Sequence, residues 1–195
     1  MKTNFITNNE EIKNGLLEIG IKEFSISSNS SQENRQHIRR HIEISQENFC
    51  RHVKNNEDIG LGLLDNLMDE KNTSIFFHAG YKIPGLLNFN IITVNHSKII
   101  IIHNICVPEG EEKGTGRKLI DYVKALAAKL GIQKIAVLPI GTSKEFYTKQ
   151  GFIEDEELNG YLIYELKGGK RKTRTNRKTR KTRKYRKKRH TYKRK

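Results

Sequence analysis

A glycine-rich turn is the segment whose residue types point most directly to chemistry. It lies between a strand-like run and a helical pattern, and it reads Lys113-Gly114-Thr115-Gly116-Arg117-Lys118. Unpaired backbone N–H groups and the helix dipole at such a helix N-terminus form a phosphate site, and glycines let the backbone approach the ligand. Lys113, Arg117 and Lys118 add positive charge. The turn therefore predicts a phosphate-binding site, and a flexible turn without a ligand is the competing interpretation.

Two common phosphate loops do not match this turn. A Walker loop requires Gly-Lys-Ser/Thr after a four-residue gap, whereas Arg117 and Lys118 follow here. A dinucleotide-binding fingerprint requires a third glycine at the position that Leu119 occupies. The expected phosphate site is of neither type.

A second segment follows the next strand-like run, after Pro139. Thr142 and Glu145 form a capping box that opens a helix, and Gly151 ends it. The segment reads Glu145-Phe146-Tyr147-Thr148-Lys149-Gln150-Gly151-Phe152. Together the two segments resemble the Gcn5-related N-acetyltransferase (GNAT) family. In that family a strand ends in an Arg/Gln-x-x-Gly-x-Gly/Ala loop before a long helix, and a later short helix ends in Tyr-x-x-x-Gly-Phe.

The resemblance covers residues 74–166 and implies both a fold and an activity. The implied fold is α/β, with a mixed, mostly antiparallel central sheet flanked by helices and a splayed strand pair that forms the cofactor cleft. The implied enzyme moves the acetyl group of acetyl-CoA to a primary amine by direct transfer in a ternary complex. The acceptor stays open between protein lysine, N-terminal amine, polyamine, aminoglycoside and other small amines, and so does the oligomeric state.

The resemblance also implies which residues hold acetyl-CoA. The pyrophosphate is expected on the backbone amides of Lys113, Gly114, Gly116 and Arg117, and the pantetheine arm beside the strand 99–107. Ser143 stands where the family commonly has Ala. The implied cofactor-binding residues are Cys106, Val107, Lys113, Gly114, Thr115, Gly116, Arg117, Lys118 and Ser143. No metal site is expected.

Tyr147 is the implied catalytic residue. Collapse of the tetrahedral intermediate expels a thiolate, and a phenol near the sulfur can protonate it. The position of Tyr147 before Gly151-Phe152 matches the family pattern. A tyrosine that only packs between helix and sheet is the alternative.

The base that deprotonates the amine stays open. A lysine-type amine, with a pKa of about 10.4, is mostly ammonium at neutral pH and must lose a proton before it attacks. Isoleucines fill positions 99–102, where relatives keep a Glu or His on the cleft strand. His103, Glu109, His78 and a water chain remain as candidates. Cys106 is expected to be a small apolar strand residue because transfer in the family is usually direct.

Two positions depart from the family pattern. Glu111 stands where the loop begins with Arg or Gln, and Ile140 stands where an Asn often holds the pantetheine. These departures motivate an alternative function, a catalytically degenerate protein of this fold whose basic tail binds nucleic acid as a virion or packaging component.

The middle and end of the chain supply the elements that must position these residues. Runs rich in Ile, Phe and Val at 74–78, 86–94 and 98–107 predict antiparallel strands, separated by Gly80, Pro84-Gly85 and Asn95-His96. An apolar stripe from Leu119 to Leu130 predicts a long helix ended by Gly131. Further strands are expected at 134–138, 152–153 and 160–166. The strand–helix–strand order predicts one right-handed parallel crossover.

The first third of the chain is less regular. The first twenty residues, with Ile12, Leu16, Leu17 and Ile19 at helical spacing, are expected to form a short amphipathic helix, and alternation predicts a weak strand at 22–27. Residues 31–72 predict two or three short helices.

Charge divides the chain into a domain and a tail. The net charge of the 195 residues is +15, yet 17 of the 37 basic residues and no acidic ones lie in residues 168–195. Residues 1–167 therefore hold 20 basic and 22 acidic residues and form the expected folded domain. Residues 168–195 are expected to be disordered, because they have almost nothing apolar to bury.

Several roles for residues 170–195 stay open. They are a nucleic-acid tether, a nuclear import signal, a membrane-surface anchor, a lysine-rich target of the enzyme itself and a solubilising tail. A tether would bind polyanions in a salt-dependent way. Its Arg-Lys-Thr-Arg repeats resemble basic tails of proteins from large DNA viruses, so composition suggests a viral source.

Location follows from what the sequence lacks. Cys50 and Cys106 follow no metal-ligand spacing, and the chain shows no charged-then-apolar leader. No stretch approaches the ~20 apolar residues that span a bilayer. An intracellular protein of the cytoplasm, nucleus or virion is therefore expected, and not a secreted one.

Overall fold

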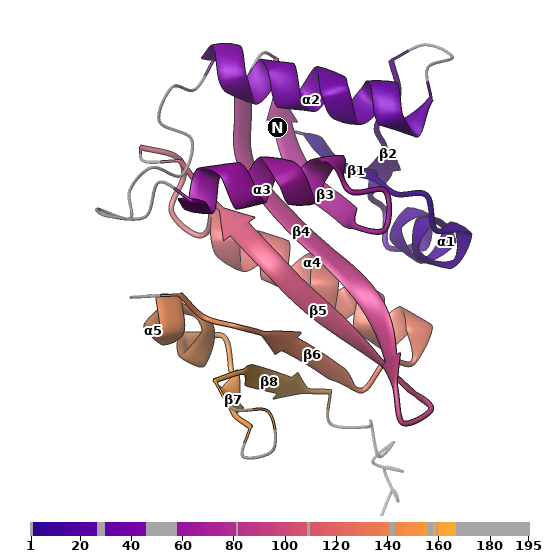
Figure 1. Cartoon of the computed structure of the whole chain (residues 1–195), viewed down its shortest axis with the longest axis vertical. Coiled ribbons are helices and arrows are strands. Elements are labelled where there is room, and N and C mark those ends of the chain that lie inside the picture. The colour runs from indigo at the N-terminus through magenta and orange to yellow at the C-terminus, as the bar shows by residue number, and fades with distance from the viewer. Residues whose placement is uncertain are drawn as a thin grey trace, which may run out of the picture.

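The computed structural model describes residues 2–26, 30–45, 58–80, 82–108, 110–140, 143–155, 158 and 160–166. In chain order they form β1 (Lys2–Ile6), α1 (Glu10–Glu18), β2 (Lys22–Glu23), α2 (Ser31–Ser45), α3 (Asp58–Met68), β3 (Thr73–Ala79), β4 (Lys82–Val94), β5 (Ser97–Cys106), α4 (Thr115–Leu130), β6 (Lys134–Val137), α5 (Ser143–Lys149), β7 (Ile153–Glu154) and β8 (Leu162–Glu165) (Figure 1). The expected tail at 168–195 lies outside these ranges.

An eight-stranded sheet connects the whole domain. Its strand order is β2-β1-β3-β4-β5-β6-β8-β7. Neighbouring strands pair antiparallel except β1 with β2 and β5 with β6, which pair parallel. The parallel β5–β6 pair is the crossover predicted through α4. The α/β fold class, with a mixed and mostly antiparallel sheet flanked by helices, is therefore confirmed.

Helices cover the two faces of the sheet unequally. α1 and α4 contact each other, and α4 also contacts β4, β5 and β6, whereas α2 and α3 contact each other and the strands from the other side. Figure 1 shows α2 and α3 in front of the upper part of the sheet and α4 behind it. In the described part of the chain, no helix lies in front of the lower part of β4, β5 and β6.

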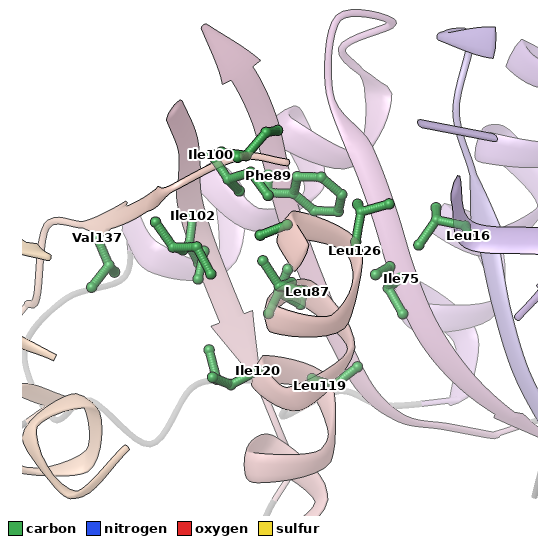
Figure 2. Close-up of a cluster of buried hydrophobic side chains, with 14 of the residues drawn as sticks. Leu16, Ile75, Leu87, Phe89, Ile100, Ile102, Leu119, Ile120, Leu126 and Val137 are labelled. Atoms are coloured by element: carbon green, nitrogen blue, oxygen red, sulfur yellow. The ribbon is translucent and has the colours of Figure 1, made fainter. Parts of the chain in front are cut away.

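The larger core lies between α4 and the sheet. The apolar stripe of α4 is buried as predicted, and Figure 2 shows Leu119, Ile120 and Leu126 beside sheet residues that include Leu87, Phe89, Ile100 and Ile102. Each fully buried side chain of this kind contributes roughly 1.5–3 kcal/mol. A second cluster lies under α2 and α3. α4 is thus held rigidly along its length, which fixes where its N-terminus points.

The β4–β5 hairpin carries an irregularity that matters for the site. Its turn is Asn95-His96, with φ of 48° and 64°, as a two-residue hairpin turn requires. Along the ladder, Phe89 pairs with Ile102 but Asn88 pairs with Asn104. His103 is therefore an extra residue, a β-bulge in β5.

β5 also extends beyond its other neighbour. Its last pair with β6 is Ile102 with Val137, so residues 103–106 have no partner on that side among the described strands. The main chain of β5 diverges from β6 at the position of the bulge. This divergence is the strand splay that the resemblance implied.

Two predictions for the strands were wrong. Residues 2–6 form β1, not part of a helix, because Phe5 and Ile6 are buried in the cores on opposite faces of the sheet. The helix starts only after Asn9, whose Oδ1 accepts from the N–H of Ile12 at 3.0 Å. Pro84-Gly85 does not separate two strands but lies inside β4. Phe77 pairs with Gly85 and Ala79 with Lys82, so Pro84 sits in a second bulge, where its missing N–H is tolerated.

The other strands and helices agree with the expected order. The two helices expected between 31 and 72 are α2 and α3, and the weak strand at 22–27 is shortened to Lys22–Glu23. Gly131, with φ of 69°, ends α4 as predicted. Thr142 of the predicted capping box lies outside the described residues, and its helix begins at Ser143.

A buried arginine joins α2 to the end of α3. The Arg35 side chain is 0% exposed, and its guanidinium donates to the carbonyls of Leu67 at 2.6 Å and Asn72 at 2.7 Å. Desolvation by burial lowers the pKa of Arg35, although Asp69 and Glu70 partly offset it. Arg35 thereby satisfies carbonyls that the end of a helix leaves without donors.

Replacing Arg35 by Leu should lower the free energy of unfolding by about 2–4 kcal/mol, because two buried carbonyls lose their donors. Arg39→Leu is the matched control, since Arg39 pairs with Glu43 on the same helix but is 40% exposed. We expect the control to change stability by less than about 0.5 kcal/mol. Chemical denaturation measures both, and equal losses would show that Arg35 does not hold α3.

Candidate functional site

The glycine-rich turn leaves a set of backbone donors open at the start of α4. Gly114 is the N-cap, with φ of 93°, and no side chain caps the helix there. The N–H of Thr115 bonds to the Glu112 carbonyl and that of Lys118 to the Gly114 carbonyl. Among the described residues no acceptor bonds the remaining N–H groups of the turn, those of Lys113, Gly114, Gly116 and Arg117. These are the amides that the sequence nominated for a pyrophosphate.

The charged side chains of the turn are mostly paired. Lys118 Nζ lies 2.9 Å from Glu112, and Arg117 Nε lies 3.7 Å from Asp121. Lys113 makes no ion pair with any described residue. The positive character of the turn therefore comes from the backbone amides, the helix dipole and Lys113 more than from Arg117 or Lys118.

Gly116 brings the two sequence motifs together. A Cβ at Gly116 would lie 3.3 Å from the ring of Phe146 on α5 and 3.5 Å from the side chain of Val107 after β5. Gly85 has a similar role, because a Cβ there would lie 2.8 Å from the Thr115 side chain. The start of α4, the end of β5 and α5 thus meet at one place.

Three predicted binding residues already have local partners for their side chains. Thr115 is 1% exposed and its hydroxyl donates to the Glu112 carbonyl at 2.7 Å. The Ser143 hydroxyl accepts from the N–H of Ile140 at 2.9 Å, which fixes the entry into α5. Cys106 is a buried strand residue as expected, 3% exposed at the end of β5, and it is disulfide-bonded. Cys106 ends β5 and Val107 follows it, both beyond the last β5 pair with β6.

Tyr147 lies in the main core at the base of α5. It is 3% exposed and packs edge-on against Phe146 and Phe152, with ring centroids 5.1 and 5.6 Å away. No described residue hydrogen-bonds its hydroxyl. Desolvation by burial raises the pKa of Tyr147 well above its ordinary value, so the phenol stays protonated at neutral pH.

Lys124 is a residue that the sequence analysis missed. Its Nζ donates to the Gln150 carbonyl at 2.6 Å and lies 4.0 Å from the ring centroid of Tyr164. Burial lowers the pKa of Lys124. It caps the end of α5 from α4 and so helps to set the orientation of Tyr147. The sequence signal for Lys124 was its position on the polar side of the apolar stripe of α4. Its partner Gln150, however, is distant in the sequence.

The candidate bases occupy different places. His103 is the bulge residue of β5, beside the point where β5 leaves β6. His78 lies on β3, two strands away from β5, and its ring packs against Phe24 at 5.7 Å. Glu109 lies outside the described residues. Of the described candidates, only His103 lies on β5, at the point where its pairing with β6 ends.

Other features of the described residues do not point to this site. A cavity of about 380 Å³ lies between α5, β7 and β8, and its lining includes Pro139, Lys144 and Tyr161. The described residues contain no cluster of His, Cys, Asp and Glu that could hold a metal ion. None of their helices is long and apolar enough to cross a membrane.

Comparisons with known proteins bear on the fold. No family model and no curated protein matches the sequence. The structure is similar to Tetrahymena GCN5, with a TM-score of 0.54 and 14% identity over 85% of this chain and 96% of that one. It is also similar to the N-acetyltransferase PaiA of Thermoplasma acidophilum, solved with coenzyme A, with a TM-score of 0.50 and 16% identity over 69% and 94%. The fold is that of the GNAT acetyltransferases. At these identities the similarity establishes the GNAT fold and no more.

Proposed function

We propose that this GNAT-fold chain is an N-acetyltransferase that moves acetyl from acetyl-CoA to a primary amine by direct transfer in a ternary complex. The observation that carries the proposal is the set of open amides at the start of α4, on Lys113, Gly114, Gly116 and Arg117, beside the unpaired edge of β5. One of the two similar proteins named above, PaiA, is an N-acetyltransferase by name and is solved with coenzyme A, which supports the same cofactor here.

The donors fit the two chemically different parts of acetyl-CoA. The amides at the start of α4 would bind the pyrophosphate, since anions bind at helix N-termini through such groups. The main chain at Cys106 and Val107 would pair with the pantetheine amides, because strand edges carry both donors and acceptors. The space around Gly114 supports this assignment, because no atom lies within 4 Å of a Cβ placed on Gly114.

Tyr147 would supply the proton for the leaving thiolate. Its hydroxyl has no described partner, and its raised pKa keeps the proton in place until the thiolate forms. Lys124 would act as a positioning residue, because it holds the end of the helix that carries Tyr147.

The alternative function, a catalytically degenerate protein of this fold, rests on Glu111 and Ile140. Ile140 is 48% exposed and leaves its side chain out of the core. The open amides do not depend on either side chain, so we favour a working cofactor site. The test of this proposal also compares lysine peptides, polyamines and aminoglycosides as acceptors of the acetyl group.

A second proposal concerns residues 170–195 and is independent of the enzymatic one. Residues 170–195 would bind nucleic acid and hold the domain near it, a role that their charge supports. The viral source stays a prediction from composition.

Isothermal titration with acetyl-CoA tests the cofactor site, with Gly114→Ala against Gly131→Ala. Both glycines have positive φ, 93° and 69°, at opposite ends of α4, so the backbone strain of the two variants is matched. We expect Gly114→Ala to weaken binding at least about tenfold, since relieving the strain turns the amides away. Gly131→Ala should stay within about twofold. No detectable binding by the unaltered chain at high micromolar concentration would refute the proposal.

Tyr147→Phe should lower kcat by about 100-fold and leave the acetyl-CoA dissociation constant unchanged, because only the proton donor is removed. The assay follows release of coenzyme A thiol with a panel of a lysine peptide, spermidine and kanamycin. Tyr122→Phe is the control, since its hydroxyl contacts Thr3 at 3.2 Å on another part of α4. Full turnover in Tyr147→Phe would remove Tyr147 as the acid.

The tail should account for binding to nucleic acid. We expect the affinity of the full chain for a DNA duplex to fall by about a thousandfold between roughly 50 and 200 mM salt, as contacts with several phosphates require. A chain ending at residue 167 should show no binding in the same anisotropy assay. Equal binding by both chains would place the interaction on the domain.

A further inference from the structure

Exposed apolar side chains gather around the cavity between α5, β7 and β8. This cavity has a volume of about 380 Å³. Among the described residues, seven large hydrophobic side chains are exposed. Four of them adjoin a lining residue of the cavity in the chain or lie in the turn between two lining residues, and we call them the apolar rim: Leu138, Ile140, Ile153 and Leu158. Single exposed apolar residues are common on proteins, but a group of them in one place marks an interaction site.

The turn from β7 to β8 holds part of this rim in position. The N–H of Leu158 donates to Oδ1 of Asp155 at 3.0 Å, and the N–H of Tyr161 donates to the Leu158 carbonyl at 2.9 Å. A Cβ at Gly160 would lie 3.4 Å from the side chain of Leu138, which directly follows β6. The turn and the end of β6 therefore lie against each other, and the rim belongs to one surface.

The cavity is separate from the residues proposed to hold acetyl-CoA. None of those nine residues, and not Tyr147, is among the described residues that line it. Figure 1 shows α5, β7 and β8 together at the lower end of the molecule, away from α2 and α3. The acetyltransferase proposal thus leaves the cavity and its rim without an occupant.

The charge beside the cavity is mainly negative. Glu154 and Asp155 line it, and Lys144 is the one cation among the described lining residues. Lys144 pairs with Glu154, and this hydrogen bond lowers the pKa of Glu154, so the carboxylate is ionised at neutral pH. In the sequence two more acidic residues, Glu156 and Glu157, follow Asp155. An occupant with an apolar body and positive charges on both sides of it fits this surface.

The C-terminal residues of the same chain have this chemistry. Residues 168–195 hold 17 basic residues and no acidic ones, and their only large side chains with an apolar body are Tyr185 and Tyr192. Tyr185 stands directly between Lys184 and Arg186, whereas Tyr192 follows a threonine. Tyrosine combines a large apolar ring with a polar tip, and tyrosine and arginine supply much of the binding energy at interfaces. Lys184-Tyr185-Arg186 is therefore the part of the tail that best matches the cavity.

The covalent connection allows this segment to reach the cavity. Leu162 at the start of β8 lines it, and the described residues end at Leu166, about 13 Å further along the chain. Tyr185 follows 19 positions later (185 − 166), and 19 residues can span up to about 60 Å. A ligand tethered over such a length has an effective concentration on the order of millimolar, so even a weak site is occupied.

We propose that Lys184-Tyr185-Arg186 docks on the α5–β8 cavity of its own chain. The Tyr185 ring enters the cavity within the apolar rim, and the two cations pair with Glu154 and Asp155. The inference deepens the proposal that residues 170–195 bind nucleic acid, and it is independent of the acetyltransferase proposal. Docking occupies cations that a nucleic acid would contact, so the domain and the nucleic acid compete for the tail.

Carbodiimide crosslinking of the full chain tests the docking directly, because this reagent joins a lysine amine only to a carboxylate that it touches. At ~50 mM salt we expect mass spectrometry to find Lys184 joined to Glu154 or Asp155, and at ~1 M salt the product should disappear through screening. Glu165, 61% exposed near the other end of β8, is the reference for random coupling. No product at Glu154 or Asp155, or equal coupling to Glu165, would overturn the proposal.

A mixture of isotopically labelled and unlabelled chains identifies the source of the docked segment. Products within one chain support the proposal. Products only between chains would overturn it, since the cavity would then take the tail of a second copy.

Two pairs of matched variants separate the cavity from general attraction between charges. Tyr185→Ala should lower the yield of the Lys184 product at least about fivefold, and Tyr192→Ala should keep it within about twofold. On the domain, Leu138→Ser should have the effect of Tyr185→Ala, whereas Leu17→Ser on α1 should have none; the two leucines are 50% and 46% exposed. Unchanged yields in both Tyr185→Ala and Leu138→Ser would show that the cavity and its rim do not hold the tail.

Competition with nucleic acid is measured with Glu154→Lys and Glu165→Lys in the full chain. Each variant replaces an exposed acid that pairs with a lysine, so their net charges are equal. At ~50 mM salt, Glu154→Lys should bind a DNA duplex about fivefold more tightly than Glu165→Lys, because more of its tail is undocked. Equal affinities would overturn the competition.

The docking and the nucleic-acid role fail in different ways. If the unaltered chain does not bind DNA, the proposed role of residues 170–195 is refuted. The crosslinking experiment contains no DNA, so it still decides whether Lys184-Tyr185-Arg186 occupies the cavity.

Discussion

The position at which β5 changes its pairing is the constraint on which the rest of the site depends. Through Ile102 the strand is bonded on both sides, to β4 and β6; from His103 onward it keeps only β4. A one-residue bulge at the same point reverses which side chains face α3. The loss of β6 frees a main-chain edge, and the bulge puts polar residues beside it. The strand then runs directly into the turn that starts α4, so the edge and the amide cluster have a fixed relation.

Local patterns were enough to predict the parts of the site that are made of main chain. The glycines at 114 and 116, the α4 stripe and the hairpin at Asn95-His96 each depend on neighbours within a few residues, and all of the elements they predict are present. The cofactor assignments at those positions stay predictions. Pairing across long sequence distances was not accessible. β1 was mistaken for helix because its partner β3 lies some 70 residues away, and Pro84 was read as a break because nothing local indicates a bulge. Arg35 and Lys124 were missed for the same reason.

Electrostatics at the start of α4 follow from the pairing of its side chains. Glu112 and Asp121 neutralise much of the charge of Lys118 and Arg117, and all four groups are largely exposed, where such pairs contribute little. An anion bound here would therefore depend mainly on backbone amides whose direction α4 fixes. This explains how Glu111 can stand near the turn without removing the donors. The domain differs in this from residues 168–195, which hold 17 of the 37 basic residues and no acidic ones.

Burial gives Tyr147, the proposed acid, and His103, one of the candidate bases, complementary states. Desolvation disfavours a charged form, so it keeps the Tyr147 phenol protonated and the His103 ring neutral under the same conditions. One group then begins the reaction with a proton to give and the other with a lone pair to receive one. A raised pKa also makes Tyr147 a weaker acid. The uncharged state of both groups is thus a consequence of packing, of the core that holds α5 against the sheet for Tyr147 and of burial at the β5 bulge for His103.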